Sequence, residues 1–508
     1  MEMVELEPVT LGQLLSSLEG RVEILERRGN MAQRILAITD DSRTATTGGL
    51  FVAVKGERVD GHTFVKQAMQ SGAAAVVSQA PVVTGSLPFA RVADSRKALG
   101  ILGSRFHGDP SAHMLMVGVT GTNGKTTSTY LCKAMLEGMG RGVGLIGTVS
   151  YQIGQEVVPA SHTTPGALEL QHLLARMARA QLNTVVMEVS SHALALDRTA
   201  GCDYDVALFT NLTQDHLDFH RTMEEYFEAK RRLFTELGTD RKTGQRAIIN
   251  MDDPSAERMR SACRVPVWGY AVHGKAEIKA ENVKLMLGGT SFTAATPAGT
   301  MKIESHLVGE HNVYNLLGAI GVALHAGAAP NQVRESIGRV QNVPGRFERV
   351  AAGQDFTVVV DYAHTEDALL RLLTAAQALK TNRIITVFGC GGDRDKGKRP
   401  KMGRAAVEHS DVVILTSDNP RTEDPMAILR DVEAGVREVL GRKGPVEYHL
   451  IADRREAIRT AVRLARPGDM VLIAGKGHED YQIIGTTKIH FDDREVAREA
   501  IHRLRNCA

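Results

Sequence analysis

The sequence predicts an α/β fold of three domains, and three observations support this fold class. The chain has 508 residues, well beyond the size at which a single hydrophobic core stops growing. Short apolar runs that barely alternate with polar residues are typical of buried parallel strands, and they occur in two sets separated by "NVPGRFERV". Helix-length sequence lies between most successive runs, which is the pattern of doubly wound sheets. We therefore expect a small N-terminal α/β domain at 1–94, a central parallel-sheet domain at 95–342 and a C-terminal Rossmann-like domain at 343–508.

Each domain has its own run of expected elements. In the first, "DSRTATTGGLFVAVKG" and "HTFVKQAMQSGAAAVVSQ" predict a strand, a helix and a short apolar strand. The second begins with a helical linker and continues with the strands "MLMVGV", "NTVVMEV", "DVALFTN" and "RAIIN". In "VKLMLGGTSFTAAT" we expect a hairpin that turns at Gly288-Gly289. The third domain has the strands "FTVVVDYAH", "RIITVFGC", "DVVILTSDN", "VEYHLIA" and "DMVLIAGKG".

Composition excludes several classes of function. The 61 basic and 59 acidic residues leave a net charge of +2, so no global field attracts nucleic acid or an anionic membrane. The N-terminal "MEMVELEPVTLGQLL" lacks the basic start of a signal peptide, and no apolar run is long enough to cross a bilayer. The five cysteines form no C-x-x-C pair, so neither a disulfide framework nor a zinc site is indicated. We expect a cytoplasmic protein with reduced thiols, no nucleic-acid partner and no membrane insertion.

The stretch "VGVTGTNGKTTST" has the order of a phosphate-binding loop, but its glycines are displaced. In G-x-x-x-x-G-K-[ST] the first glycine would stand at Val119, whereas the nearest glycines are Gly118 and Gly121. A strand still runs into a glycine turn and then into a helix, so backbone N–H groups at the helix N-terminus would face an anion. Lys125 would supply a cation for the outer phosphates, and the Thr126 hydroxyl could ligate magnesium. The alternative is a glycine turn with a chance lysine. The nucleotide-binding residues expected in this loop are Gly121, Thr122, Asn123, Gly124, Lys125, Thr126 and Thr127.

Polar residues also follow two other strands of the central domain. "VVMEVSSHAL" places Glu188 at the carboxyl end of one strand, and "LFTNLTQDHLDFH" places His216 beyond another. Ligands gather at that edge of a parallel sheet. Taken separately, Glu188 could be a capping carboxylate and His216 a surface histidine; beside a magnesium-binding loop they indicate a site. The loop alone does not separate a ligase from a GTPase switch, a kinase or a transport ATPase.

Seven motifs together resemble one family. "TGTNGKTT", "MEVSSH", "NLTQDHLDFH", "YFEAKRRLF", "GEHNVYN", "PGRFE" and "DYAH" occur in the order seen in the Mur ligases, across all three expected domains. The resemblance implies an ATP-dependent, amide-bond-forming ligase of peptidoglycan precursor synthesis, in which the displaced glycine is usual. "DSRTATTGGLFVAVKG" is similar to the UDP-binding domain of the family member that adds the third peptide residue. The folylpolyglutamate synthases share the loop and the general plan, but their kind of N-terminus is not found here.

The resemblance also implies a mechanism and a metal site. Such ligases transfer the γ-phosphate of ATP to a substrate carboxylate, and an amine then attacks the acyl phosphate. Lys125 and two magnesium ions would neutralise the phosphates, with Thr126 and Glu188 holding one ion and His216 helping to hold the other. Lys230 in "YFEAKRRLF" matches a lysine that the family carries as a carbamate, which would act as a further metal ligand. From the residues alone, a solvated helix lysine beside Arg231 and Arg232 is the favoured interpretation of Lys230, and only the resemblance reverses it. The implied catalytic residues are Lys125, Glu188, His216 and Lys230.

Further contacts follow from the same motifs. Arg346 lies at the domain junction, where a phosphate contact could sense closure. Leu196 stands where a glutamine is common in relatives, which puts that contact in doubt. In isolation, the serines and threonines of these motifs could be caps or turn residues. The implied nucleotide contacts are Asn312, Arg346, Asp361 and His364, and the implied contacts to UDP-MurNAc-dipeptide are Ser42, Thr163, Thr164, Ser190 and Arg198.

The incoming amino acid is indicated by "TSDNPRTEDP". Asp-Asn-Pro is a good turn, and Asp418 or Asn419 could simply cap the next helix. The resemblance favours a site, because D-N-P-R is the form found in diaminopimelate-adding ligases and lysine-adding relatives lack the arginine. The Arg421 guanidinium could grip the distal carboxylate of meso-diaminopimelate through two parallel hydrogen bonds. The implied amino-acid-binding residues are Arg394 of "GCGGDRDKGKRP", Asp418, Asn419, Pro420, Arg421, Gly475 and Glu479.

We thus expect a monomeric enzyme that adds meso-diaminopimelate to UDP-MurNAc-L-Ala-D-Glu with ATP and Mg2+. The alternatives are a lysine-adding ligase of the same family and a P-loop nucleotide switch without ligase chemistry.

Overall fold

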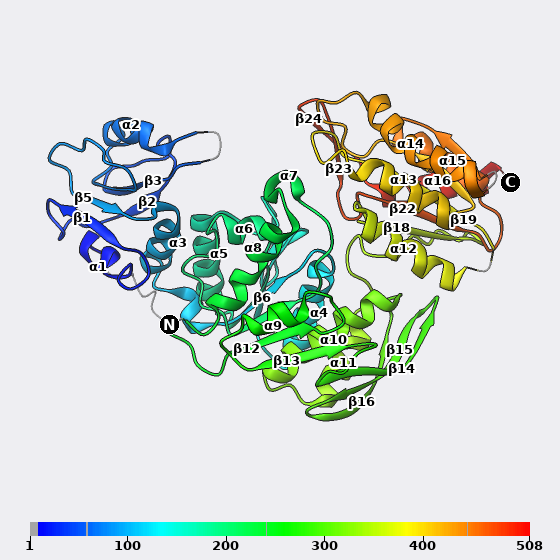
Figure 1. The fold of residues 1–508 in the computed structure, drawn as a ribbon, viewed down its shortest axis with the longest axis horizontal. Helices are drawn as coiled ribbons and strands as arrows, with labels where there is room; N and C mark the ends of the chain where they lie inside the picture. Colours follow the sequence, from blue (N-terminus) through cyan, green and yellow to red (C-terminus); the bar gives the residue numbers. More distant parts are fainter. Residues whose placement is uncertain (1–8, 57–58, 240, 381, 444–445, 508) are drawn as a thin grey trace.

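The computed structural model describes residues 9–56, 59–239, 241–380, 382–443 and 446–507, and it confirms the three-part α/β fold. In Figure 1 the N-terminal part (blue) and the C-terminal part (yellow to red) flank the central part (cyan to green). Residues 1–8 lie outside the described residues. They begin the stretch "MEMVELEPVTLGQLL", in which no signal peptide is expected. Each part is built on a larger sheet of its own.

The N-terminal sheet has the order β1-β5-β4-β3-β2, and β1 alone runs antiparallel to its neighbour. Leu50 of β3 belongs to a core with α1 and α3, whereas Phe51 belongs to a second core with α2. Burial on both faces explains why this strand is continuously apolar. The expected strand, helix and strand are confirmed. The elements are β1 (Ile24–Arg28), β2 (Ala37–Thr39), β3 (Gly49–Ala53), β4 (Ala75–Ser78), β5 (Phe89–Val92), α1 (Leu11–Ser16), α2 (Val65–Gln70) and the linking helix α3 (Ser95–Phe106).

The central sheet has 11 strands in the order β16-β15-β14-β13-β12-β11-β6-β10-β7-β8-β9. The four expected strands are parallel neighbours at its centre. Val117 and Met116 of β6 point into different cores, one shared with α4 and α10 and the other with α5 and α8. The strands are β6 (Leu115–Thr120), β7 (Val143–Ile146), β8 (Ser150–Ile153), β9 (Glu156–Pro159), β10 (Thr184–Glu188), β11 (Val206–Phe209), β12 (Arg246–Asn250), β13 (Val267–Ala271), β14 (Ile278–Met286), β15 (Gly289–Thr296) and β16 (Gly299–Ser305). The helices are α4 (Lys125–Glu137), α5 (Ala167–Arg179), α6 (Ser191–Ala195), α7 (Leu217–His220), α8 (Met223–Glu236), α9 (Ala256–Ser261), α10 (Glu310–His325) and α11 (Pro330–Arg339).

The expected hairpin is present, but its turn lies one residue earlier than the expected Gly288-Gly289. Met286 of β14 pairs with Gly289 of β15, so the turn consists of Leu287 and Gly288. Gly289 is therefore the first residue of β15, whose following residues, Thr290 to Thr296, also pair with β16.

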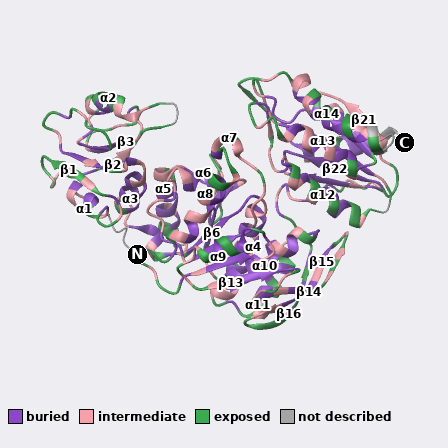
Figure 2. Cartoon of the chain, in the orientation of Figure 1, coloured by how far each residue is buried: buried purple, intermediate pink, exposed green. Residues whose placement is uncertain are grey.

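The C-terminal sheet has the order β17-β18-β22-β19-β20-β21 and is parallel except for β17. Helices α12, α13 and α14 pack on one face, and α15 and α16 on the other, which confirms the second doubly wound sheet. Figure 2 shows these strands buried beneath helices that are exposed on their outer sides. The elements are β17 (Glu348–Arg349), β18 (Thr357–Asp361), β19 (Ile384–Phe388), β20 (Val412–Leu415), β21 (Glu447–Leu450), β22 (Met470–Ala474), the hairpin β23 (Tyr481–Ile484) and β24 (Thr487–His490), and α12 (Glu366–Leu379), α13 (Lys398–His409), α14 (Pro425–Lys443), α15 (Arg454–Leu464) and α16 (Asp493–Cys507).

Two further expectations concern the whole chain. Among the described residues, no helix is both long and apolar enough to span a membrane. The cysteines whose side chains are described are all free thiols, namely Cys132, Cys202, Cys263 and Cys390. The side chain of Cys507 lies outside the described residues.

Candidate functional site

The backbone conformation and close neighbours of the loop between β6 and α4 explain why its glycines are displaced from the ordinary motif. Gly121 has a φ of 145°, and a Cβ there would lie 1.8 Å from the Thr210 hydroxyl oxygen. Gly124 has a φ of 86°, and a Cβ there would lie 2.4 Å from Asn315 Oδ1. Val119, where the ordinary motif has glycine, is a buried β6 residue paired with Leu208 of β11, so it carries a side chain without conflict. The loop needs glycine at 121 and 124 because neighbouring side chains approach its backbone there.

The loop lysine and threonine make contacts that a ligand could replace. Lys125 Nζ donates to the carbonyl oxygens of Gly121 (2.9 Å) and Thr122 (2.8 Å), and burial lowers the pKa of this amine. The Thr126 hydroxyl oxygen accepts a 3.0 Å hydrogen bond from Arg346 Nη2 of the C-terminal part. The chance-lysine alternative is disfavoured, because Lys125 folds over the loop at the N-terminus of α4.

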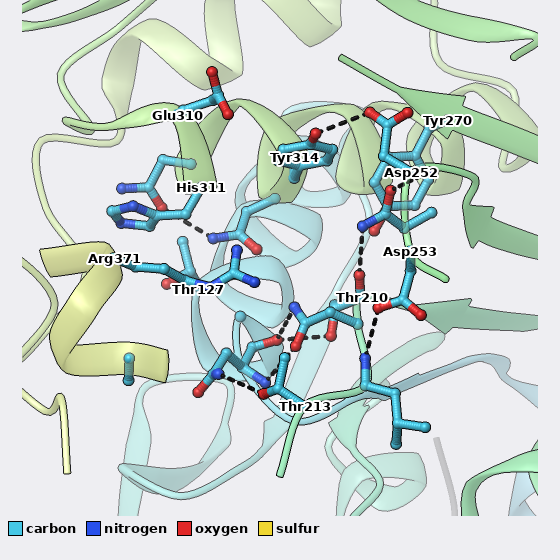
Figure 3. A pocket seen from close by; sticks show the side chains of 18 of the residues that line it. Thr127, Thr210, Thr213, Asp252, Asp253, Tyr270, Glu310, His311, Tyr314 and Arg371 are labelled. Atoms are coloured by element: carbon cyan, nitrogen blue, oxygen red, sulfur yellow. Dashed lines mark hydrogen bonds between the residues drawn. The ribbon is translucent and has the colours of Figure 1, made fainter. Parts of the chain in front are cut away.

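A cavity of about 450 Å³ opens beside this loop, between the central and C-terminal parts (Figure 3). Asn312 donates to the Val308 carbonyl and accepts from Asn315. Asp361, whose pKa is raised by burial, accepts from the backbone of Phe347 and Ala363. The expected nucleotide contacts that line the cavity are Asn123, Gly124, Thr127, Asn312, Arg346 and Asp361.

The same cavity contains residues that sequence analysis did not single out. Asp252 accepts hydrogen bonds from Tyr314 (2.8 Å) and from three successive backbone N–H groups that start at Val272. It follows the carboxyl end of β12, and that position in "RAIINMDD" was the available indication. The others include Thr210, Asn250, Tyr270 and Arg371.

Lys230 is the clearest departure from an ordinary helix lysine. Its residue exposure is 1%, Nζ donates to the Gly121 carbonyl at 2.8 Å, and Nζ lies 4.4 Å from the Tyr226 ring centroid. Burial, reinforced by Lys125, lowers the pKa of Lys230 well below its usual value. The alternative of a solvated helix lysine is therefore wrong. A buried neutral amine is the form of lysine that can add carbon dioxide.

The remaining donors fit magnesium in part. Glu188 ends β10, and its carboxylate accepts from the Thr148 backbone (2.9 Å) and hydroxyl (3.0 Å). The carboxylate of Glu188 and the hydroxyl of Thr126 are hard oxygen donors of the kind magnesium takes. In the described part of the chain, no three His, Cys, Asp or Glu side chains cluster as a metal site. A metal here would thus depend on Thr126 and on a modified Lys230.

His216 lines a second cavity and lies close enough to Lys125 and Lys230 for their charges to act on its ring. Its φ of 55° is left-handed, Nε2 lies 3.4 Å from Asp215 Oδ2, and its ring packs edge-on to His192 with centroids 4.7 Å apart. Burial lowers the pKa of His216 to about 3, His192 adds to this effect, and Asp215 opposes it. His216 is therefore neutral and offers a nitrogen lone pair.

The second cavity, of about 370 Å³, collects the expected amino-acid site. Asn419 donates to Glu479 (3.0 Å) and accepts from the Ile483 N–H (2.9 Å), whereas Asp424 accepts the N–H groups at the start of α14. The helix-cap alternative for Asp418 or Asn419 is therefore wrong. The lining residues include Arg394, Asp418, Asn419, Arg421, Gly475 and Glu479, together with His216 and His364. His364 thus lies here and Asp361 in the first cavity, so the loop after β18 serves both.

The two carboxylates of this cavity differ in whether they already have a partner. Glu479 is already paired with the buried Lys476 at 2.9 Å. Asp418 Oδ1 is buried, lies 3.7 Å from Lys476 Nζ and accepts no hydrogen bond within the described residues. It is therefore the better acceptor for an ammonium group. Arg421 donates from Nη1 to the Gly392 carbonyl (2.8 Å). Pro420, also expected to bind the amino acid, does not line this cavity, and its carbonyl oxygen lies against Gly392.

Four of the five expected UDP-substrate residues meet at the end of β10. The Thr164 hydroxyl donates to the Glu188 carbonyl (2.8 Å) and accepts from the Ser190 N–H (3.0 Å), while Arg198 donates to the Thr164 carbonyl (3.1 Å). Thr163 bonds Thr148 at 3.0 Å. Ser190 also caps α6, so its capping role is real. Ser42 lies in the N-terminal part, buried and donating to Gln67, and Leu196 follows the last residue of α6.

Known proteins match every part of the chain. The Mur ligase family catalytic domain model matches residues 34–107, the Mur ligase middle domain 119–323, and the Mur ligase glutamate ligase domain 345–477. A UDP-N-acetylmuramoyl-L-alanyl-D-glutamate–2,6-diaminopimelate ligase of Geobacillus thermodenitrificans is 48% identical over 97% of this chain and 100% of its own. A protein of the same name from Geobacter metallireducens is 46% identical over 94% of this chain and 96% of its own.

Solved structures agree. A structure bearing the same ligase name is 34% identical, with a TM-score of 0.70, and covers 98% of this chain and 99% of its own. A MurF ligase from Thermotoga maritima in complex with ADP is 18% identical, with a TM-score of 0.60 over 93% of this chain and 98% of its own, and shares the fold. Since the three models cover most of the sequence and relatives at 46–48% identity match it nearly end to end, the chain belongs to the Mur ligase family.

Proposed function

We propose that this enzyme joins meso-diaminopimelate to UDP-MurNAc-L-Ala-D-Glu, with conversion of ATP to ADP and phosphate. The observation that carries the proposal is the second cavity, where Arg421 of D-N-P-R lies with Asp418 and Glu479. A guanidinium and two carboxylates match an amino acid that has a carboxylate and an ammonium group at each end. The relatives named as 2,6-diaminopimelate ligases, at 44–48% identity, support the same substrate.

The residues divide the reaction between the two cavities. The first takes ATP, whose phosphates lie against the N–H groups of the loop and draw Lys125 Nζ away from the carbonyls of Gly121 and Thr122. The substrate carboxylate attacks the γ-phosphorus, and ADP leaves. The amine of the second substrate then attacks the acyl carbon, displacing phosphate and releasing a proton. Arg346 spans from the C-terminal part to Thr126, so it contacts the phosphate region only when the two parts are together.

We further propose a magnesium site and a carbamate on Lys230. Thr126, Glu188 and the carbamate would hold one ion and His216 would help hold a second; when bound, magnesium neutralises phosphate charge. The support is the burial of Lys230 and its lowered pKa, which favours the amine that can form a carbamate. The Thr163, Thr164, Ser190 and Arg198 group, with Ser42, is proposed to contact the UDP-linked substrate.

The proposed setting follows from the substrates. ATP and UDP-linked precursors are cytoplasmic small molecules, so we propose that the enzyme acts in the cytoplasm. We also propose that it is a monomer with no nucleic-acid or membrane partner. We propose domain limits of 1–94, 95–342 and 343–508, because each range contains one of the three larger sheets.

The test is phosphate release with defined co-substrates. We expect release to require the UDP-linked acceptor and an amino acid together, and to be strong with meso-diaminopimelate and weak with L-lysine. Because Arg421 is half-buried, lysine should lose about 2–3 kcal/mol, roughly 30- to 150-fold in kcat/KM. Arg421→Ala should remove this preference. ATP turnover without an amino acid would favour the nucleotide switch, and equal use of both amino acids would refute Arg421 as the selectivity residue.

A further inference from the structure

Two loops carry arginines into the second cavity. Arg394 lies in the loop after β19, and Arg421 lies in the loop after β20. Arg394 Nη1 donates to the Asp393 carbonyl (3.0 Å) and Arg421 Nη1 to the Gly392 carbonyl (2.8 Å). Within the described residues, no carboxylate forms an ion pair with either guanidinium. Both cations are therefore available to an anionic group of a substrate, provided that the loops hold them in place.

An ion pair between a buried arginine and a partly buried glutamate joins the two loops. Arg399, 0% exposed at the start of α13, bonds both carboxylate oxygens of Glu423, with Nη1 to Oε2 at 3.0 Å and Nη2 to Oε1 at 2.8 Å. Arg399 also donates to the Gly391 carbonyl (3.2 Å) and to Asp431 (2.9 Å). Glu423 accepts the Asp393 N–H at 2.6 Å. One carboxylate of the second loop thus fixes the backbone that precedes Arg394.

A second pair of bonds lies beside the first. The Thr422 hydroxyl donates to Asp393 Oδ1 at 2.8 Å, and the Thr422 N–H donates to Oδ2 at 3.2 Å. Asp393 and Arg421 are both left-handed, with φ values of 53° and 51°. Non-glycine residues hold this conformation only where their surroundings impose it. The contacts of Glu423 and Thr422 with Asp393 supply that constraint on the Arg394 side, and the Ile483 carbonyl accepts the Arg421 N–H.

We infer that Glu423 and Arg399 are positioning residues for amino-acid selectivity, which hold the loops so that Arg394 and Arg421 face one substrate anion. Neither side chain lines the cavity; they act through the backbone of the loops. The inference rests on the proposed function. It adds which residues fix the positions of the Arg394 and Arg421 guanidinium groups. Loss of the pair lets the loops separate, which weakens binding of the distal carboxylate more than binding of a lysine side chain.

The experiment measures kcat and KM for meso-diaminopimelate, L-lysine and ATP in Glu423→Gln, which keeps the side-chain size but removes the charge. We expect KM for meso-diaminopimelate to rise roughly tenfold, with kcat and KM for ATP within about threefold of the parent. The preference over lysine should fall by a similar factor. Arg399→Lys keeps the positive charge but loses the two parallel hydrogen bonds to Glu423. Its preference for meso-diaminopimelate over lysine should lie between those of the parent and Glu423→Gln. Glu438→Gln is the matched control, because Glu438 of α14 pairs with another α13 arginine, Arg404, at 2.6 Å, away from the loops.

Unchanged preference in folded Glu423→Gln would overturn the inference, and so would an equal loss with both amino acids. If Glu423→Gln does not fold, Thr422→Val decides, with an expected loss of preference of about threefold; no change there would also overturn it. The parent enzyme separates this result from the proposed function. A parent that releases no phosphate with meso-diaminopimelate refutes both, whereas a normal parent with unshifted variants refutes this inference alone.

Discussion

Lys230 is almost completely buried although two charged residues, Arg231 and Arg232, follow it on helix α8, and its sequence neighbours give no sign of this burial. Arg231 pairs with Glu228 of α8 and Arg232 pairs with Asp197, which follows α6, while Lys230 donates to the Gly121 carbonyl. A second, partly buried lysine, Lys125, acts on this amine, and two positive charges so close together are disfavoured. An anionic carbamate would relieve that repulsion.

Lys230→Ala should be nearly inactive and should regain part of its turnover with added formate or acetate, because the missing group is an anion. The measurement is phosphate release against carboxylate concentration, with Lys133→Ala, an α4 lysine paired with Glu137, as the control. Rescue by an alkylamine instead, or an active enzyme whose Lys230 has unmodified mass, would show that the group needed at position 230 is not an anion.

Lys125→Ala tests the phosphate site at the same scale. Its amine is the cation of the loop, and removing one stabiliser of a developing oxyanion lowers kcat by about 10²–10³-fold. We expect turnover to fall at least that far in a folded protein. Near-normal phosphate release by a clean preparation would contradict the assignment of the ATP site.

At the scale of elements, the loop between β6 and α4 needs a residue without a side chain at Gly121. Gly121→Ala would place a methyl group against Thr210 and force alanine to a positive φ, with a penalty of at least about 1–2 kcal/mol from the backbone alone. We expect a lower unfolding temperature and weaker nucleotide binding, measured by thermal unfolding with and without ATP. Gly166→Ala is the control, because a Cβ there has nothing within 4 Å. Equal effects in both variants would contradict the role given to the loop.

The elements themselves could be predicted where local chemistry decides them. The central strands are apolar because both faces are covered, and Glu188 follows from the strand end that it occupies. The hairpin was misplaced by one residue because two adjacent glycines fit a turn equally well, and only the register of β14 with β15 separates them.

The site could be predicted only in part. Motifs located the phosphate loop and D-N-P-R, but Tyr314 reaches Asp252 across 62 residues of sequence, and His192 meets His216 between different helices. Such contacts depend on how helices pack, which no local pattern encodes.

At the scale of the whole molecule, the C-terminal part bonds directly to the phosphate loop. Asp367 of α12 accepts three hydrogen bonds at one oxygen, from Asn123 of the loop (2.7 Å), Thr213 (3.3 Å) and Arg371 (2.8 Å). Arg346 adds its bond to Thr126. Both contacts join the two sides of the first cavity, so they link loop geometry to the position of the C-terminal part.

Asp367→Ala should therefore loosen closure without removing any group that we place on a substrate. An acyl phosphate in a site that closes poorly is exposed to water, so phosphate release should exceed peptide product, and KM for ATP should rise about three- to tenfold. The measurement is the ratio of phosphate to ligated product, which is one in a coupled enzyme. Lys401→Ala is the control, because Lys401 also bridges the two parts, at 3.1 Å to Gln214, but on the exposed surface. A ratio of one and an unchanged KM for ATP in Asp367→Ala would show that Asp367 takes no part in closure, and an equal disturbance in Lys401→Ala would show that any contact between the parts has the same effect.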